Sequence, residues 1–225
     1  GSSYSRVIDL GDAGNGSAPI GSLISDGTYL YGTTQHGGTY GNGIVFKVKT
    51  DGSGYVKLHE FTALPSPRYP YGALVSDGTY LYGLTPGGGT NNMGALFKIK
   101  TDGSGYADIL DFDGSTHGSY PQGALFFDGT FLYGMTPFGG ANGAGIVFKI
   151  KTDGSAFLTI HDFAGNPDGS APYGSLNSDG TYLYGMTNAG GANDLGTIFK
   201  IKTDGSGYLK ILDFAGIAKI GRAHV

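Results

Sequence analysis

The side chains that could do acid-base chemistry recur along the chain every 51 residues. Asp-Gly pairs begin at Asp26, Asp51, Asp77, Asp102, Asp128, Asp153, Asp179 and Asp204. A second series comprises Glu60 and the aspartates at 9, 111, 162 and 213. These acids either bond backbone or Tyr hydroxyls of a neighbouring repeat, or form a ring that holds a cation. Because a calcium site needs several oxygen ligands converging from one loop, the structural interpretation is favoured.

The remaining acids and the histidines form no catalytic or metal-binding pattern. Asp12, Asp108, Asp113, Asp168 and Asp194 stand outside the repeat, and no paired acids for glycoside hydrolysis can be picked out among them. No two histidines have a metal-ligand spacing, and the chain has no cysteine. The sequence therefore predicts no catalytic residue, no metal and no cofactor. If an enzyme is hidden here, its best candidates are His36, Arg68, His117, Asp168 and Asp194.

The histidines at 59 and 161 have a structural interpretation. Both precede an acid of the second series, and their equivalents are Leu110 and Leu212. We expect packed imidazoles at these two positions.

Two further markers keep the period of 51 residues. Lys-Thr-Asp-Gly-Ser begins at Lys49, Lys100, Lys151 and Lys202, and a double glycine at Gly37, Gly88, Gly139 and Gly190. Such self-similarity indicates one supersecondary unit stacked against copies of itself. The predicted repeats are 11–61, 62–112, 113–163 and 164–214, within a single domain over 3–214.

Composition supports a folded all-β protein and limits its partners. Apolar residues make up 39% and charged residues 14%, and the 44 glycines recur at fixed turn positions. The net charge is −4, with no Lys/Arg cluster, so the sequence predicts no nucleic-acid partner. No apolar run approaches the roughly 20 residues that span a bilayer, so we expect no membrane insertion.

Each repeat reads as four short strands. In the second repeat the expected strands are 72–76, 79–85, 94–101 and 106–112, with tight Asp-Gly turns joining the first to the second and the third to the fourth. Pairing about a turn at 51–54 would place Glu60 opposite Val45. Four antiparallel strands in about 50 residues is the size of a propeller blade.

The links between the other strands are longer and differ between copies, so they should emerge together on one face. Rigid scaffolds with variable loops commonly bind through those loops, although these could also be mere spacers. The predicted ligand-binding residues on this loop face are His36, Tyr40, Asn42, Arg68, Tyr69, Asn91, Asn92, His117, Tyr120, Phe138, Asn142, Asn188, Asn193 and Asp194.

These motifs resemble a named repeat family. Tyr/Pro-x-Gly-(Ser/Ala)-Leu, x-Leu-Tyr-Gly-x-Thr, Gly-Gly and Phe-Lys-(Ile/Val)-Lys-Thr-Asp-Gly-Ser are similar to the bacterial GloVer tandem repeat, and the match runs from Tyr4 to Phe214. The resemblance implies a propeller-type domain of unassigned activity in exported, envelope-attached proteins. The double glycine is also similar to kelch repeats, but the kelch Trp is missing here.

Blade counting leaves one strand over. Residues 3–10 align with the fourth strand, as do 55–61, 106–112, 157–163 and 208–214. The fold class is therefore an all-β β-propeller with four four-stranded blades plus one extra N-terminal strand. Four blades could close within one chain, which is slightly favoured, or two chains could form an eight-bladed ring as a homodimer. The non-repeat tail 215–225 resembles a translated sequencing adapter, which predicts a truncated metagenomic fragment.

The predicted function is a non-enzymatic, carbohydrate-binding type of module in a secreted or cell-surface protein. Its loop face would hold a glycan or another surface macromolecule. The alternatives are a purely structural repeat scaffold and, last, a propeller enzyme with an axial active site. A scaffold predicts loops without ligand, whereas an enzyme requires copy-specific residues to converge near the axis.

Overall fold

The repeat folds into four separate antiparallel sheets in a computed structural model that describes residues 6–10 and 13–215. The first sheet holds β1 (Ile24–Ser25), β2 (Tyr29–Thr34), β3 (Ile44–Lys49) and β4 (Val56–Glu60). The second holds β5 (Val75–Ser76), β6 (Tyr80–Thr85), β7 (Ala95–Lys100) and β8 (Ala107–Asp111). The third holds β9 (Phe126–Phe127), β10 (Phe131–Thr136), β11 (Ile146–Lys151) and β12 (Leu158–Asp162). The fourth holds β13 (Asn177–Ser178), β14 (Tyr182–Thr187), β15 (Thr197–Lys202) and β16 (Leu209–Asp213). A short 3-10 helix, η1 (Ala13–Asn15), precedes them.

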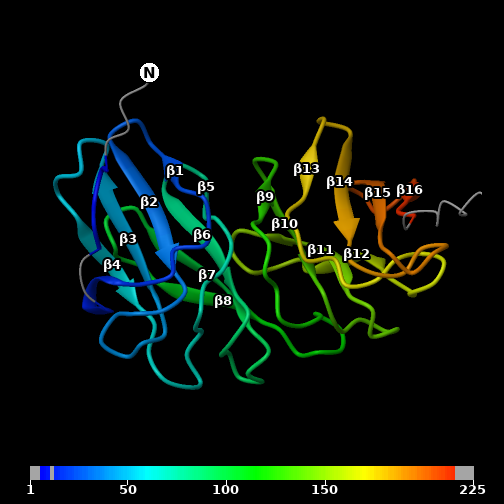
Figure 1. Ribbon diagram of the computed structural model, residues 1–225, viewed down its shortest axis with the longest axis horizontal. Helices are drawn as coiled ribbons and strands as arrows, with labels where there is room; N and C mark the ends of the chain where they lie inside the picture. Colours follow the sequence, from blue (N-terminus) through cyan, green and yellow to red (C-terminus); the bar gives the residue numbers. More distant parts are fainter. Residues whose placement is uncertain (1–5, 11–12, 216–225) are drawn as a thin grey trace, which may run out of the picture.

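Strands follow chain order within each sheet, as expected of propeller blades (Figure 1). We number the sheets as blades 1 to 4. The propeller prediction is thereby confirmed. The innermost strand of each blade is only two residues long, shorter than the expected five.

The Asp-Gly turns are held by their own carboxylates. Asp77 Oδ1 accepts hydrogen bonds from the backbone amides of Thr79 at 2.8 Å and Tyr80 at 2.7 Å. Its Oδ2 accepts one from the Tyr82 hydroxyl at 2.7 Å. The same three bonds occur at Asp26, Asp128 and Asp179. The repeated aspartate therefore fixes the hairpin and anchors the tyrosine of the second strand.

The register between the third and fourth strands differs from the expected one. Glu60 lies opposite Ile44, and Val45 lies opposite His59, so the expected Glu60–Val45 pair is wrong. The chain already turns between Lys49 and Ser53, whose amide and carbonyl bond at 3.0 Å. A β-bulge between Val45 and Phe46 then shifts the pairing again.

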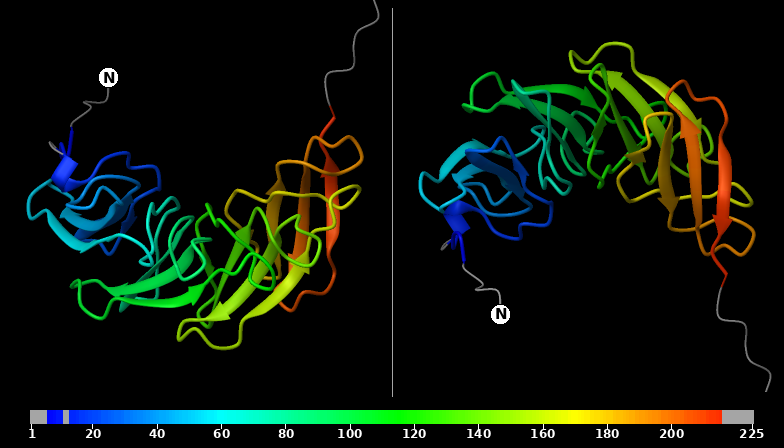
Figure 2. Two further views of the ribbon diagram at one scale, coloured as in Figure 1. Left: turned by 90° about the horizontal axis from the view of Figure 1, so that it is seen from below. Right: turned by 90° about the horizontal axis from the view of Figure 1, so that it is seen from above.

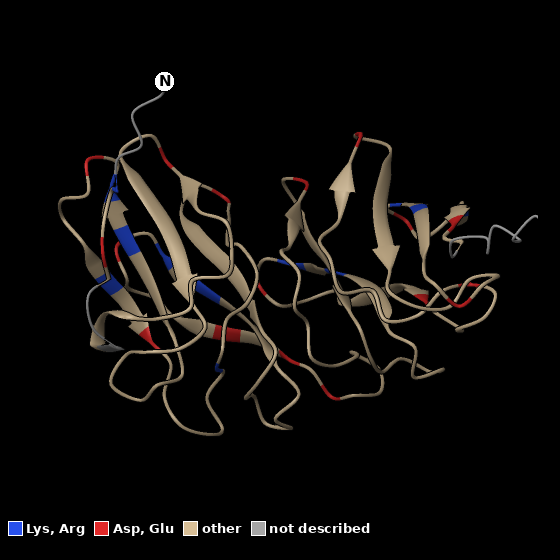
Figure 3. Ribbon diagram, viewed as in Figure 1, with Lys and Arg blue, Asp and Glu red and all other residues tan. Residues whose placement is uncertain are grey.

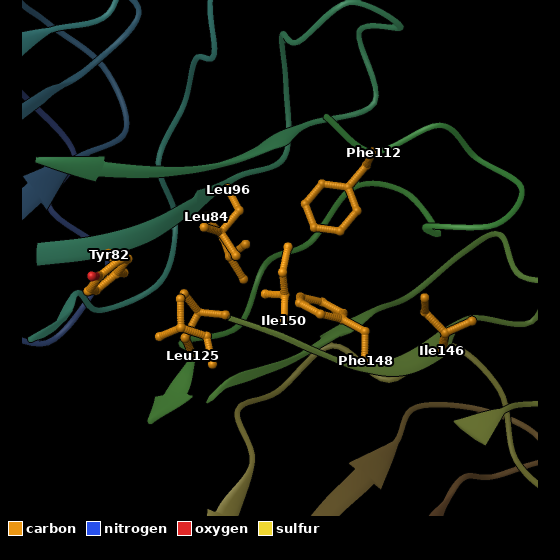
Figure 4. Packing of buried hydrophobic residues seen from close by; sticks show 9 residues of the cluster. Tyr82, Leu84, Leu96, Phe112, Leu125, Ile146, Phe148 and Ile150 are labelled. Carbon is orange, nitrogen blue, oxygen red and sulfur yellow. The ribbon is translucent and has the colours of Figure 1, made fainter. Parts of the chain in front are cut away.

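Neighbouring blades pack face to face through apolar side chains. Between blades 2 and 3, Phe112, Leu96 and Tyr82 meet Leu125 and Phe148 in one buried cluster (Figure 4). Equivalent clusters join blade 1 to blade 2 and blade 3 to blade 4. Burial of apolar surface between blades, more than within them, holds the repeats together.

Polar contacts repeat at these interfaces. Lys47 Nζ donates to the Thr101 carbonyl at 2.9 Å, and Lys149 Nζ to the Thr203 carbonyl at 2.9 Å. At the inner edge, a Cβ on Gly21 would lie 2.7 Å from the Gly72 carbonyl oxygen. Only glycine permits such close approach of adjacent blades.

The four blades follow an open arc (Figure 2). Gly174 occupies the position of Gly21 in blade 4, and nothing lies within 4 Å of a Cβ built there. The expected closure of four blades within one chain is therefore wrong for this structure. The blades turn too little from one to the next for blade 4 to reach blade 1.

The surplus N-terminal segment only partly matches its prediction. Residues 3–5 lie outside the described residues, and 6–10 form no strand. Nevertheless the Val7 carbonyl oxygen lies directly against Gly52. The Leu58 carbonyl oxygen of the fourth strand of blade 1 lies against Gly103 of blade 2 in the same way. Residues 6–10 thus occupy the position of a fourth strand in a blade preceding blade 1.

Candidate functional site: the loop face

The second series of acids closes the loops of its own blades. Asp162 Oδ2 accepts from the Ala141 amide at 2.7 Å, and Asp213 Oδ1 from the Ala192 amide at 2.8 Å. Glu60 and Asp111 do the same at residues 39 and 90. These acids therefore tether the loop between the second and third strands of their own blade, not a neighbouring one. Among the described residues no cluster of three or more potential metal ligands is present.

Ion pairs reinforce the same position in the first and last blades. Lys57 pairs with Glu60, and Lys210 pairs with Asp213 at 2.9 Å. The hydrogen bond from Lys57, followed by bonds from Thr39, lowers the pKa of Glu60 to about 2. The carboxylate is therefore ionised at neutral pH and serves the loop.

Most predicted asparagines are structural. Asn42, Asn91 and Asn193 donate their side-chain amides to the carbonyls of Thr62, Phe112 and Phe214. Asn142 Nδ2 donates to Asp162 Oδ1 at 3.3 Å. The amides of these four asparagines thus stabilise the loops. Asn188, in the loop between β14 and β15 of blade 4, is exposed.

The left-handed loop residues brace the turns too. The Gly190 amide donates to Asp194 Oδ1 at 2.9 Å, and the Gly88 amide donates to Asn92 Oδ1 at 3.2 Å. Both Asp194 and Asn92 have a positive φ, near 56° and 55°, a conformation that Asn and Asp tolerate better than most residues.

Aromatic rings from separate blades meet on the loop face. Phe138, from the loop between β10 and β11, packs edge-to-face with Tyr120 at 6.2 Å between centroids. Phe138 also packs edge-to-face with Tyr173, which precedes the first strand of blade 4, at 6.1 Å between centroids. We call Tyr120, Phe138 and Tyr173 the aromatic row. Tyr120 and Phe138 are exposed. The three rings come together in space although they are as much as 53 residues apart in the sequence.

A second group of side chains lies over blades 1 and 2. His36 packs edge-to-face on Tyr69 at 5.4 Å, and the Arg68 guanidinium lies 5.2 Å from the centre of the same ring. Arg68 also donates to Asn92 Oδ1 at 2.9 Å. Four predicted residues, His36, Arg68, Tyr69 and Asn92, are thus brought together. Tyr40 is exposed and takes part in neither group.

An axial groove adjoins the aromatic row. Its walls are the inner segments 20–22, 71–73, 122–124 and 173–175 of the four blades, and its volume is about 280 Å³. Tyr173 lines the groove and belongs to the aromatic row. The sequence analysis missed Tyr173, although its place before the Gly-Ser-Leu of the innermost strand could have revealed it.

The candidates for catalysis remain in separate local pairs. His117 Nδ1 lies 2.8 Å from Asp113 Oδ2, and His161 Nε2 lies 3.1 Å from Asp168 Oδ2. Burial raises the pKa of Asp113, but the hydrogen bonds from His117 and Ser115 lower it by more. The net pKa of Asp113 therefore lies below the ordinary value of an aspartate. His36 and Arg68 meet at Tyr69, apart from these pairs. Each of the two His–Asp pairs contains only one of the five candidate residues, so neither pair assembles the predicted catalytic set.

Charge is spread thinly over the molecule. Figure 3 shows Lys and Arg distributed along the strands of the four blades without gathering in one patch.

No helix among the described residues is long and apolar enough to cross a membrane.

Comparison with solved structures gives the fold. The chain superimposes on a putative TolB from Agrobacterium tumefaciens with a TM-score of 0.55 and 14% identity, covering 87% of this chain and 68% of that one. An oligogalacturonate lyase from Vibrio parahaemolyticus gives 0.56 and 16%, covering 89% and 53%. The GH74 enzyme of Niastella koreensis gives 0.59 and 19%, covering 85% and 29%. At such identity the likeness shows the propeller fold alone.

Comparison by sequence gives the family. The Gloeobacter/Verrucomicrobia repeat matches residues 1–131 and 127–223, which confirms the resemblance seen in the motifs. No curated protein matches the chain. The chain spans 63% of the nidogen/laminin-complex chain and 53% of the Vibrio lyase, so it is shorter than the propellers it resembles.

Proposed function

The chain belongs to the Gloeobacter/Verrucomicrobia repeat family, and we propose that it is a non-enzymatic binding module whose loop face holds a glycan. The aromatic row carries this proposal. Exposed aromatic side chains on a rigid scaffold bury large area on binding at little cost in conformational entropy. We propose further that the module works outside the cell, where glycans are displayed.

The row suits a sugar chain better than a charged ligand. An aromatic face offers apolar area to the C–H face of a sugar, and the hydroxyls of Tyr120 and Tyr173 can bond to sugar hydroxyls. The neighbouring groove of about 280 Å³ could take one sugar unit at the axis. In the group of His36, Arg68, Tyr69 and Asn92, the guanidinium of Arg68 already donates a hydrogen bond to Asn92 Oδ1, so it is partly engaged within the protein and less suited to an anionic ligand.

The proposal is tested by titrating the protein with a panel of soluble neutral and acidic polysaccharides, using calorimetry and affinity electrophoresis. We expect Tyr120→Ala and Phe138→Ala each to weaken binding of the responding glycan about tenfold, or about 1.4 kcal/mol. Tyr40→Ala is the matched control, because Tyr40 is also an exposed aromatic residue of the loop face but lies outside the aromatic row. It should leave affinity unchanged.

Three results would count against the proposal. If no polysaccharide binds, the loops are spacers and the structural-scaffold alternative is favoured. If new reducing or unsaturated ends form during incubation, the protein is an enzyme. Equal losses for Tyr40→Ala and Phe138→Ala would remove the special role of the aromatic row.

A further inference from the structure

Blade 4 exposes apolar side chains that the other blades bury. Phe214 is 38% exposed, whereas its equivalent Phe163 is 0% exposed. Met186 is 54% exposed, whereas Met135 is 3% exposed. We call the set the terminal face; it comprises Met186, Leu195, Ile211, Leu212 and Phe214.

This exposure comes from a missing neighbour. Leu209, on the same strand, is exposed, but so are its equivalents Val56 in blade 1 and Leu158 in blade 3, so its exposure is not specific to the open end. Ile211 differs, because its equivalents Leu58 and Ile160 are buried against the following blade. The terminal face is therefore half of a repeated interface, and a cavity of about 300 Å³ lies on it beside Tyr173 and Met186.

The opposite end of the arc presents the other half. Leu23 of blade 1 is 51% exposed, whereas its equivalent Leu74 is 3% exposed. The backbone of the receiving segment already has the interface conformation. Ala18 has φ 54°, like Tyr69 at 63° and Ala171 at 52°.

Polar groups at the two ends also match. In the internal interfaces the Tyr69 amide donates to the Asn42 carbonyl at 2.8 Å, and the Ala171 amide donates to the Ala144 carbonyl at 2.9 Å. The corresponding groups at the ends are the Ala18 amide and the Leu195 carbonyl. Lys200 similarly repeats the lysines that donate to Thr101 and Thr203, and its counterpart would be the Thr50 carbonyl.

We propose that the terminal face docks on blade 1 of a second copy of this chain, and that two arcs close head to tail into one ring. A second copy fits because its blade 1 carries the same kind of surface by which blades 2, 3 and 4 each pack against the blade before them. A contact of this heterologous kind closes when the rotation per subunit allows it.

The N-terminal segment 6–10 must give way in this assembly. It occupies the position that β16 of the second copy would take, with Val7 on Gly52 and Ile8 packed near Phe46 and Tyr55. It forms no strand, and its ion pair between Arg6 and Asp9 lies within the segment and is exposed. Displacing it gives up the packing of Val7 and Ile8, while β16 arrives with a complete blade behind it.

The test is the molar mass of the full chain by light scattering and analytical ultracentrifugation over a wide concentration range. We expect a reversible approach to twice the chain's 23.2 kDa. Met186→Asp and Leu23→Asp should each remain monomeric and folded by circular dichroism, because both residues are exposed in the single chain. Leu209→Asp is the matched control on the same strand and should still dimerise.

Mixing the two monomeric variants identifies the geometry. Met186→Asp keeps an intact blade 1, and Leu23→Asp keeps an intact terminal face, so an equimolar mixture should regain association through one unaltered interface. A wild-type mass of 23.2 kDa at every concentration would overturn the proposal. So would a Leu23→Asp variant that still dimerises, since the terminal face would then pair with itself. A mixture that stays monomeric would also overturn the proposal, because its one unaltered pair of complementary faces would then fail to associate.

Discussion

The interface between blades 2 and 3 and the open end of blade 4 have nearly the same sequence but opposite environments. Phe112 and Phe214 hold the same position in the repeat, yet Phe112 is fully buried and Phe214 is exposed. Tyr82 is buried where Tyr184 is half-buried. The comparison shows that the environment of a residue in a repeat protein depends on whether a next repeat exists.

The largest expected effect is on stability at this shared position. Phe112→Ala leaves a cavity in the cluster of Figure 4 and should lower the free energy of unfolding by about 3 to 5 kcal/mol. Phe214→Ala should cost far less in the monomer, because its ring is already partly in water. Chemical denaturation of both variants at low protein concentration measures the difference, and equal losses would contradict the comparison.

Period, strand order and turns could be predicted from the sequence because each is a local property. The Asp-Gly pairs specify hairpins by themselves, and the expected strands of the second repeat differ from the observed ones by one residue at most ends, apart from the short innermost strand. The register failed at Glu60, because neither the turn at Lys49–Ser53 nor the bulge beside Val45 has a signal in residue types.

The candidate site was predictable only as a face. Loop position identified Tyr120 and Phe138, but their meeting with Tyr173 depends on how one blade is rotated onto the next. The asparagines looked equally available in sequence, yet most are bonded to backbone carbonyls. The open arc was likewise missed, because the rotation between blades is set by packing across interfaces and has no motif.

A medium effect is expected at the turn aspartate. Asp77→Ala removes two bonds to backbone amides and the partner of the buried Tyr82 hydroxyl, so it should lower stability by about 1 to 2 kcal/mol. Asp179→Ala removes the same bonds at the open end, where the Tyr184 hydroxyl can bond water instead. Thermal unfolding should show the smaller loss for Asp179→Ala, and the reverse order would contradict this account.

The smallest expected effect is a pH dependence that originates at an internal interface. The His59 ring stacks on Tyr106 of the next blade at 3.7 Å between centroids, beside Phe61 and Glu60, and its buried Nε2 has no hydrogen-bond partner. Burial lowers the pKa of His59 to about 4 from 6.5. The unfolded chain therefore takes up a proton first, and stability should fall as the pH drops from about 6.5 to about 4.

His59→Leu copies Leu110 of blade 2 and should flatten that part of the profile by about 1 kcal/mol, allowing for partial solvent access. The remaining slope would come from His161, whose pKa burial also lowers. Stability curves of the two proteins between pH 7 and pH 4 provide the measurement. An unchanged slope would mean that His59 is accessible to protons in the folded state.

The most direct test of the central claim, that the open end of blade 4 awaits the first blade of another copy, is thiol cross-linking. The chain has no cysteine, so an L23C/M186C variant carries only the two introduced thiols. We predict that a short bismaleimide joins two chains of this variant into a closed dimer, while L23C and M186C alone do not cross-link. Cross-linking of M186C to itself, or a double variant that stays monomeric, would contradict the claim.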